Sequence, residues 1–250
     1  MRRLCRHGDG VQVVVGPPGT GKTFALDAAR EAWQASGFVV SGAAVARQAA
    51  RGLWDVAGIE STSVAALLGE LRRGPEWGLS PRSVLIVDEA GMLGTRELAA
   101  LLTHAATARA KVVLVGDHHQ LPEIDAGGTF RALVARTDPV RLTVNRRQRE
   151  PHAREMLDLW RPSRAREAMT IAAEHGELVT STSAELHSRI VGDYCAAVMG
   201  GEDAVMITLR RADARDLNRR ARAWFDDAGR LGSDHVVLAG GEFAAAISSC

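Results

Sequence analysis

The 250-residue sequence predicts an α/β protein built on a doubly wound parallel sheet. Runs that are hydrophobic throughout, typical of strands buried on both faces, recur at 11–15, 38–42, 83–89 and 111–117. Alanine- and leucine-rich stretches of helical length lie between them, and strands that alternate with helices form parallel sheets. Glycines also cluster at 16–21, between the first strand and the first helix. Sheets of this kind bind ligands at such turns.

The predicted elements follow one another in this order. Helices are expected at 22–35, 43–56, 62–73 and 95–108, with a Pro/Gly/Ser-rich connection at 73–83. After about residue 140 the pattern starts again, with strands at 140–144 and 204–209 and helices up to about residue 160 and at 212–229. We therefore predict a first domain at 1–140, a partial second domain at 141–230, and a tail at 231–250 without a recognisable element.

Composition excludes several classes of protein. Hydrophobic residues make up 46% and charged residues 24% of the chain, as in ordinary globular proteins. No apolar run approaches the roughly 18 residues that cross a bilayer, so no membrane segment is predicted. The first ten residues contain arginines but no apolar stretch, unlike a signal peptide. We expect a cytoplasmic protein; its oligomeric state is left open.

The net charge of +1 conceals an uneven distribution of arginine. Only Lys22 and Lys111 are lysines among the 31 basic residues. Arginines cluster at 141–166 and again at 210–222. Each cluster alone is equally well explained as a solvated helix face. Two clusters in one half of the chain favour a polyanionic partner.

The segment GPPGTGKT (16–23) matches the phosphate-binding loop pattern, between a strand and a helix. Glycines allow backbone N–H groups to turn toward phosphate oxygens, and the helix N-terminus adds partial positive charge. Lys22 is predicted to reach the β- and γ-phosphates, and Thr23 to bind Mg²⁺. The predicted nucleotide-binding residues are Gly16, Pro17, Pro18, Gly19, Thr20, Gly21, Lys22 and Thr23.

The segment VLIVDEAG (84–91) predicts the second half of this site. A buried strand delivers Asp88 and Glu89 to the sheet edge where ligands bind. Asp88 is expected to hold Mg²⁺, and Glu89 to orient and deprotonate the attacking water. An adjacent glutamate favours hydrolysis over transfer to an acceptor, which argues against a small-molecule kinase.

The segment KVVLVGDHHQLPEIDAGGTF (111–130) ends a third buried strand in a polar loop. Gln120 in this loop is placed to sense the γ-phosphate or its loss. On spacing alone, a solvated loop amide explains Gln120 equally well.

In order and spacing, GPPGTGKT, VDEAGML, GDHHQLPEIDAGG and LTVNRRQRE resemble the motifs of superfamily 1 DNA helicases. The resemblance is closest to the RecD-like group and to the helicase part of TraA-type conjugative relaxases, and it covers roughly residues 10 to 230. It implies a P-loop NTPase with RecA-like domains, ATP and Mg²⁺ as cofactors, and 5′ to 3′ movement on single-stranded DNA.

The resemblance also assigns roles to individual residues. NRRQ (145–148) corresponds to the family's N-x-R-Q motif, which makes Arg147 the arginine finger on the γ-phosphate. Arg146 could replace it, or both could be solvated arginines. The segments 41–50 and 61–68 resemble the first DNA-contacting segments, with Arg47, Thr62 and Ser63 as DNA-binding residues. The basic residue of the first segment is shifted by one position.

The sequence thus predicts the ATP-hydrolysing core of a 5′–3′ DNA helicase. The late motifs of the family are absent between residues 230 and 250, so we interpret the chain as a fragment with weak or no unwinding by itself. A module that binds DNA in a nucleotide-dependent manner, without motor activity, is the alternative.

Overall fold

The computed structural model describes residues 2–6, 8–74, 78–119, 128–160, 164–238 and 241–246, with side chains as far as residue 232. The chain forms two compact units, Met1–Ala168 and Met169–Cys250. Among the described residues, no helix is both long and apolar enough to cross a membrane.

The first unit contains a six-stranded sheet of order β3-β2-β4-β5-β1-β6, in which all paired strands run parallel. Its strands are β1 (Val11–Val15), β2 (Val39–Ala44), β3 (Ser61–Ser63), β4 (Ser83–Asp88), β5 (Lys111–Gly116) and β6 (Val140–Arg141). This arrangement confirms the predicted α/β fold with a doubly wound parallel sheet.

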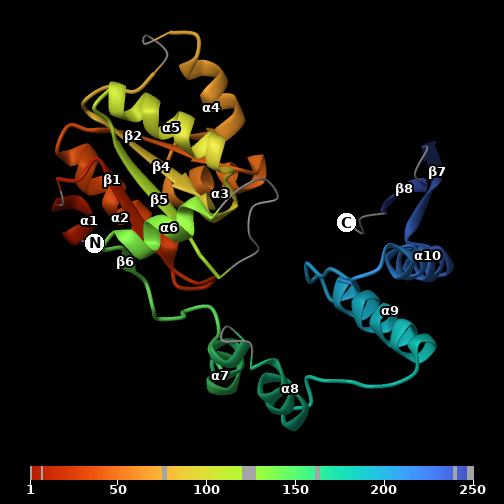
Figure 1. The fold of residues 1–250 in the computed structure, drawn as a ribbon. Coiled ribbons are helices and arrows are strands. Elements are labelled where there is room, and N and C mark those ends of the chain that lie inside the picture. Colours follow the sequence, from red (N-terminus) through yellow and green to blue (C-terminus); the bar gives the residue numbers. More distant parts are fainter. Residues whose placement is uncertain are drawn as a thin grey trace. The chain divides into compact units, whose positions relative to one another are not determined.

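Helices cover both faces of the sheet (Figure 1). The helices are α1 (Arg2–Arg6), α2 (Lys22–Ala35), α3 (Arg47–Ala57), α4 (Val64–Leu71), α5 (Thr95–Thr107) and α6 (Thr129–Arg136), with the short 3₁₀ helix η2 (Ala90–Met92) after β4. Alternate strand residues face opposite sides. Leu85 and Val87 join the core beneath α4, α5 and α6, whereas Val84 and Ile86 join the core beneath α1, α2 and α3.

The central strands give the sheet its stability. Four consecutive residues of β4, Val84 to Val87, have no solvent-exposed surface. Burying a side chain of this kind contributes roughly 1.5–3 kcal/mol. The strand ends, and the loops that follow them, are therefore held on a rigid support.

Two predicted boundaries in this unit were wrong. The helix expected to begin at residue 43 begins at Arg47, and β2 continues to Ala44. Gly42 to Ala44 pair with β4 on one side and β3 on the other, so sheet pairing outweighs the helix preference of alanine. The strand expected at 140–144 is reduced to β6 because only its first two residues pair with β1.

Two short helices, α7 (Pro151–Trp160) and α8 (Ala165–Glu174), follow β6. The second unit contains the helices α9 (Ser183–Met199) and α10 (Arg211–Asp227) and an antiparallel hairpin of β7 (Leu231–Leu238) and β8 (Gly241–Ala246). Val191 and Cys195 of α9 pack with Leu217 and Ala221 of α10 in a small core.

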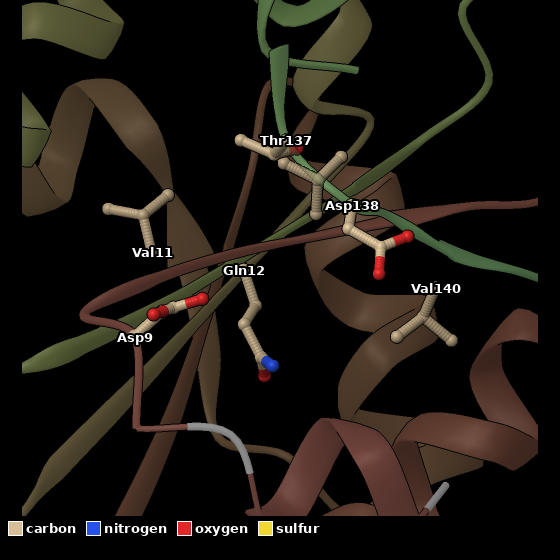
Figure 2. Close-up of a pocket in the computed structure, with 7 residues that line it drawn as sticks. Asp9, Val11, Gln12, Thr137, Asp138 and Val140 are labelled. Carbon is tan, nitrogen blue, oxygen red and sulfur yellow. The ribbon is translucent and has the colours of Figure 1, made fainter. Parts of the chain in front are cut away.

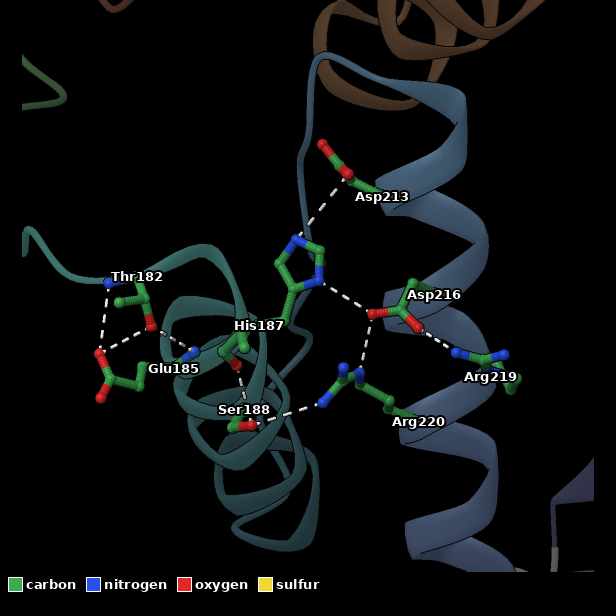
Figure 3. Close-up of polar contacts among 9 residues, drawn as sticks. Thr182, Glu185, His187, Ser188, Asp213, Asp216, Arg219 and Arg220 are labelled. Atoms are coloured by element: carbon green, nitrogen blue, oxygen red, sulfur yellow. Dashed lines mark hydrogen bonds and ion pairs between the residues drawn. The ribbon is translucent and has the colours of Figure 1, made fainter.

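A polar network also links α9 to α10 (Figure 3). His187 Nδ1 lies 2.9 Å from Asp216 Oδ2, and its Nε2 lies 3.9 Å from Asp213. Arg220 donates from Nε to the same Asp216 oxygen at 2.7 Å, and Arg219 also pairs with Asp216. Hydrogen bonds from His187 and the two arginines lower the pKa of Asp216 to about 2.

One expectation for this half of the chain was wrong, and another part of it contains strands that were not predicted. The segment 204–209 forms no strand, and Val205, Ile207 and Leu209 are exposed. Its apolar pattern suits a strand, but no described strand lies beside it to pair. The tail, in which no element was recognised from the sequence, contains β7 and β8. The division into domains at 1–140 and 141–230 stays a prediction.

Candidate functional site

The phosphate-loop sequence forms a sharp turn between β1 and α2. The Gly16 N–H donates to Gly116 O at 3.1 Å, which ties the loop to the end of β5. Thr20 folds back on Pro17 O with its N–H at 3.3 Å and its hydroxyl at 2.8 Å. Gly19 and Gly21 have φ values of 80° and 76°, which L-residues rarely adopt. Glycine is therefore required at both positions.

Close approach adds a second reason for glycine in this loop. A Cβ atom on Gly16 would lie 2.7 Å from the Thr20 hydroxyl. On Gly19 it would lie 2.7 Å from Arg147 Cβ and 2.8 Å from Asn145 Oδ1. The loop is thus compact, and the segment after β6 lies against it.

Lys22 is the first residue of α2, and its ammonium group lies over the loop. Nζ donates to Gly16 O at 2.7 Å and to Pro17 O at 3.2 Å. Burial lowers the pKa of Lys22, and the carboxylates of Asp88 and Asp117 oppose that shift. The free N–H groups of the first helical turn and this ammonium together form a site for an anion.

Asp88 ends β4, and Glu89 follows it. Asp88 Oδ1 accepts the Glu89 N–H at 2.9 Å. Burial raises the pKa of Asp88, and burial together with the Asp88 charge raises the pKa of Glu89. Glu89 also adopts a left-handed backbone with φ 54° and ψ 32°. Non-glycine residues held in such conformations are concentrated at functional sites.

Asp117 is a site residue that the sequence analysis missed. It follows β5, is buried, and accepts the His119 N–H at 3.0 Å. Its charge acts on Lys22, which follows β1. The charge of Asp88 also acts on Lys22, although β4 lies two strands away from β1 in the sheet. The signal was present in the sequence, since Asp117 directly follows a buried strand.

The segment 145–148 carries the predicted arginine finger to the phosphate loop. Asn145 Oδ1 accepts the N–H groups of Arg147 at 2.9 Å and Gln148 at 3.2 Å. The Arg146 N–H donates to Gly19 O at 2.7 Å. The positive charge of Arg147 acts on Lys22. Arg147 therefore lies beside the anion site, which is consistent with its predicted role.

The predicted DNA-binding residues lie at the same carboxyl edge of the sheet but at the ends of other strands, β2 and β3. Arg47 is exposed and begins α3, directly after β2. Thr62 lies in β3 and lines a pocket of about 360 Å³ beside β2 and α4. The Ser63 hydroxyl caps α4 by accepting the Ala66 N–H at 3.3 Å. Gln120 lies outside the described residues, so its role stays a prediction.

A second, smaller cavity lies at the opposite edge of the sheet (Figure 2). It measures about 60 Å³ and is lined by Asp9, Val11, Gln12, Val13, Thr137, Asp138 and Val140. Gln12 is buried, and its Oε1 has no hydrogen-bond partner among the described residues. Because Gln12 lies at the beginning of β1, this cavity is separate from the phosphate loop.

The sheet order, the glycine-rich loop and the acidic strand end define a P-loop NTPase with a RecA-like fold. The chain belongs to the AAA domain family, which matches residues 1–183. Within it, the predicted relationship to RecD-like and TraA-type superfamily 1 helicases is confirmed.

Three curated relatives illustrate this relationship. The "Conjugal transfer protein TraA" of Agrobacterium fabrum is 36% identical over 228 residues, which cover 90% of this chain and 20% of the relative. The "Probable conjugal transfer protein TraA" of Sinorhizobium fredii is 35% identical, covering 85% and 19%. The "ATP-dependent RecD2 DNA helicase" of Deinococcus radiodurans is 37% identical over 139 residues, covering 54% and 19%. The chain thus spans about a fifth of the length of these relatives.

Proposed function

We propose that this chain is the ATP-hydrolysing core of a DNA helicase that moves 5′ to 3′ on single-stranded DNA. The observation that carries the proposal is the meeting of four chain segments at one sheet edge. The loops after β4 and β5 and the segment after β6 bring Asp88, Asp117 and Arg147 within electrostatic reach of Lys22, which follows β1. Relatives named as a conjugal transfer protein and as an ATP-dependent DNA helicase support the assignment.

The phosphate loop binds the triphosphate. Gly19 and Gly21 keep the loop open to phosphate oxygens, and the N–H groups at the start of α2 face them. The Lys22 ammonium, which contacts the Gly16 and Pro17 carbonyls here, exchanges those contacts for the β- and γ-phosphates. Its place above the loop fits this role.

Thr23 and Asp88 are the residues that would hold Mg²⁺. The Thr23 hydroxyl and the Asp88 carboxylate are the hard oxygen donors that this ion prefers. They sit at the start of α2 and at the end of β4. When bound, Mg²⁺ neutralises charge on the phosphate oxygens. Asp88 is half-buried within reach of the Lys22 charge, and a second cation beside it would favour its ionised form.

Glu89 acts as the base that orients and deprotonates water. The pKa of Glu89 is raised toward neutral pH, and a general base works best when its pKa lies near the pH at which the enzyme operates. Arg147 stabilises the charge that develops on the departing phosphoryl group. Gln120 keeps its predicted role of sensing the γ-phosphate.

The DNA-binding part of the proposal concerns the edge beyond the nucleotide site. Arg47 follows β2, and Thr62 and Ser63 are the last residues of β3; these are the outer strands on that side of the sheet. An arginine and two hydroxyls can bind the phosphates of a DNA strand without reading its sequence. A movement of this edge that depends on the bound nucleotide would then move the bound DNA strand.

Nucleotide binding and steady-state ATP hydrolysis, each with and without single-stranded DNA, test the proposal. Lys22→Ala should abolish binding, whereas Glu89→Gln should retain binding and lose turnover. Lys111→Ala is the matched control because Lys111 is the other lysine of the chain and its Nζ contacts Asp9 O, at the opposite sheet edge. The control should behave like the unmodified chain.

Three outcomes would contradict the proposal. Absence of nucleotide binding by the unmodified chain would refute the phosphate site, and unchanged turnover in Glu89→Gln would refute its role as the base. A rate of ATP hydrolysis that does not change when single-stranded DNA is added would refute motor activity. It would favour a nucleotide-binding module. The direction of movement is tested by displacement of streptavidin from biotin at either DNA end, where release from the 3′ end alone is expected.

A further inference from the structure

The segment between β6 and α7 carries Arg147 without the support of regular secondary structure. Its residues, 142–150, form neither helix nor strand. One of the hydrogen bonds that fix its backbone joins it to the phosphate loop, where the Arg146 N–H donates to Gly19 O at 2.7 Å. The Arg147 guanidinium is exposed and has no hydrogen bond or ion pair within the described part of the chain. The position of this guanidinium therefore depends on what holds the backbone of the segment.

The side chain of Asn145 holds that backbone in a turn. Its Oδ1 accepts the N–H groups of Arg147 at 2.9 Å and Gln148 at 3.2 Å. An asparagine that accepts N–H groups two and three residues further along the chain stabilises a local turn. The same oxygen lies against the phosphate loop, because a Cβ atom on Gly19 would lie 2.8 Å from it. One side chain thus fixes both the turn that carries Arg147 and the approach of this turn to the loop.

An amide is not the group that would make these two hydrogen bonds best. The Nδ2 atom of Asn145 is buried and has no hydrogen-bond partner among the described residues, and an unpaired buried donor costs stability. An aspartate would accept the same two N–H groups more strongly and would leave no donor unpaired. Its charge, however, would lie beside a loop that is built to bind an anion. A neutral acceptor is therefore explained by a ligand that a carboxylate would repel.

We propose that Asn145 is the positioning residue for Arg147, which holds the turn that directs the guanidinium at the γ-phosphate and keeps this side of the phosphate loop free of negative charge. The inference rests on the proposed function, namely on the nucleotide site and on the role of Arg147 there. An arginine stabilises the departing phosphoryl group only from the correct position, and a misplacement of about 1 Å can cost roughly 100-fold in rate. Asn145 acts through Arg147 and not by contact with the nucleotide.

Steady-state ATP hydrolysis by single and double variants of the full chain tests the positioning role. Asn145→Ala removes the acceptor and should lower kcat roughly 10- to 100-fold without a change in the KM for ATP. Asn145→Ser, whose hydroxyl accepts such N–H groups more weakly, should recover part of the rate. In an Arg147→Ala background, Asn145→Ala should have no further effect, because it acts through Arg147. Asn218→Ala is the matched control, since Asn218 is the other asparagine of the chain and is exposed on α10.

Binding of ATP, measured by calorimetry, tests the charge argument without the need for turnover. Asn145→Asp keeps the acceptor of the turn but adds a negative charge beside the phosphate loop. It should weaken ATP binding by about fivefold or more at low salt, and added salt should reduce this difference. Asn145→Ala, which adds no charge, should bind ATP as tightly as the unmodified chain.

Other results would overturn the inference. A loss of kcat in Asn145→Ala that persists in the Arg147→Ala background would show that Asn145 supports the phosphate loop and not Arg147. Unchanged kcat in Asn145→Ala, where Arg147→Ala is impaired, would refute the positioning role and leave the proposed function intact. Equal ATP affinity of Asn145→Asp and the unmodified chain would refute the charge argument.

Failure of the proposed function gives a different pattern. Unchanged turnover in Arg147→Ala would refute the role of Arg147 itself, and the positioning role of Asn145 would fall with it. A chain that binds ATP but does not hydrolyse it would contradict the proposed function, and the comparison of ATP affinity between Asn145→Asp and Asn145→Ala would still decide the charge argument.

Discussion

The left-handed backbone of Glu89 predicts that its replacement by glycine stabilises the protein while it destroys activity. Glu89 has a φ of 54°, and Arg109, with a φ of 55°, is the other non-glycine residue of positive φ in the described structure. This conformation costs an L-residue roughly 1–2 kcal/mol, whereas glycine adopts it freely. Glycine gives back roughly 0.5–1 kcal/mol through the greater entropy of its unfolded chain. The backbone alone therefore predicts a net gain of about 0–1.5 kcal/mol.

The charge of Glu89 adds to this effect. Burial and the neighbouring Asp88 raise its pKa, so the folded state disfavours the ionised carboxylate. A carboxylate with a raised pKa destabilises the folded protein at pH values above its ordinary pKa. Its removal at pH 7 therefore stabilises further. Arg109→Gly relieves the same backbone strain without a change near Asp88, so its gain should be the smaller of the two.

Thermal unfolding and ATP hydrolysis of Glu89→Gly and Arg109→Gly test this reasoning. Each kcal/mol should raise the Tm by roughly 2–4 °C in a protein of this size. We expect a higher Tm for both variants, and loss of turnover in Glu89→Gly alone. A lower Tm for Glu89→Gly, with a higher Tm for Arg109→Gly, would show that the Glu89 side chain stabilises the fold and would refute the argument.

Two further predictions concern packing and acid stability. Gly42→Ala places a Cβ 2.1 Å from the Ser61 hydroxyl and should lower the Tm by separating β2 from β3, whereas Gly69→Ala, with nothing within 4 Å, should not. Equal melting of the two glycine variants would show that β3 moves aside. Hydrogen bonds from His187, Arg220 and Arg219 lower the pKa of Asp216 from 3.8 to about 2. The ionised Asp216 therefore stabilises the folded protein fully above pH 3.8, and this stabilisation is lost as the pH falls through about 2. Asp216→Asn should therefore be less stable than the unmodified chain at pH 7, and the difference should disappear near pH 2. A difference that persists there would exclude the ionised carboxylate as its cause.

The first half of the fold could be predicted because local signals and tertiary contacts agree there. β1 and α2 have the predicted boundaries, since a wholly apolar strand is followed by a loop that requires glycine. The prediction fails where pairing between strands, and not local sequence preference, determines the structure. Residues 43–46 favour a helix by composition, but Ala43 and Ala44 have strand partners on both sides. Residues 204–209 show the opposite case: their apolar pattern predicts a strand, but no described strand pairs with them.

Motifs identified the parts of the candidate site but not all of its contacts. Lys22, Asp88 and Glu89 were predicted from strand ends and helix starts, where the sequence position fixes the place in the fold. Asp117 follows the same rule, since it comes directly after β5, although it was not among the predicted site residues. The hydrogen bond from the Arg146 N–H to Gly19 O joins residues more than a hundred positions apart. Only the pairing of β6 with β1 brings them together.

The residues that break local rules are concentrated at the proposed active site. Glu89 has a backbone conformation that disfavours a side chain, and Lys22 and Asp88 are charged groups that are half-buried. Sequences that specify one structure satisfy local preferences nearly everywhere, and exceptions are expected where function requires them. A triphosphate with its metal ion would relieve two of these exceptions together. It would pair Lys22 with phosphate and Asp88 with a cation. The backbone strain of Glu89 would remain, because the carboxylate that acts as general base must point at water and not at a protein partner.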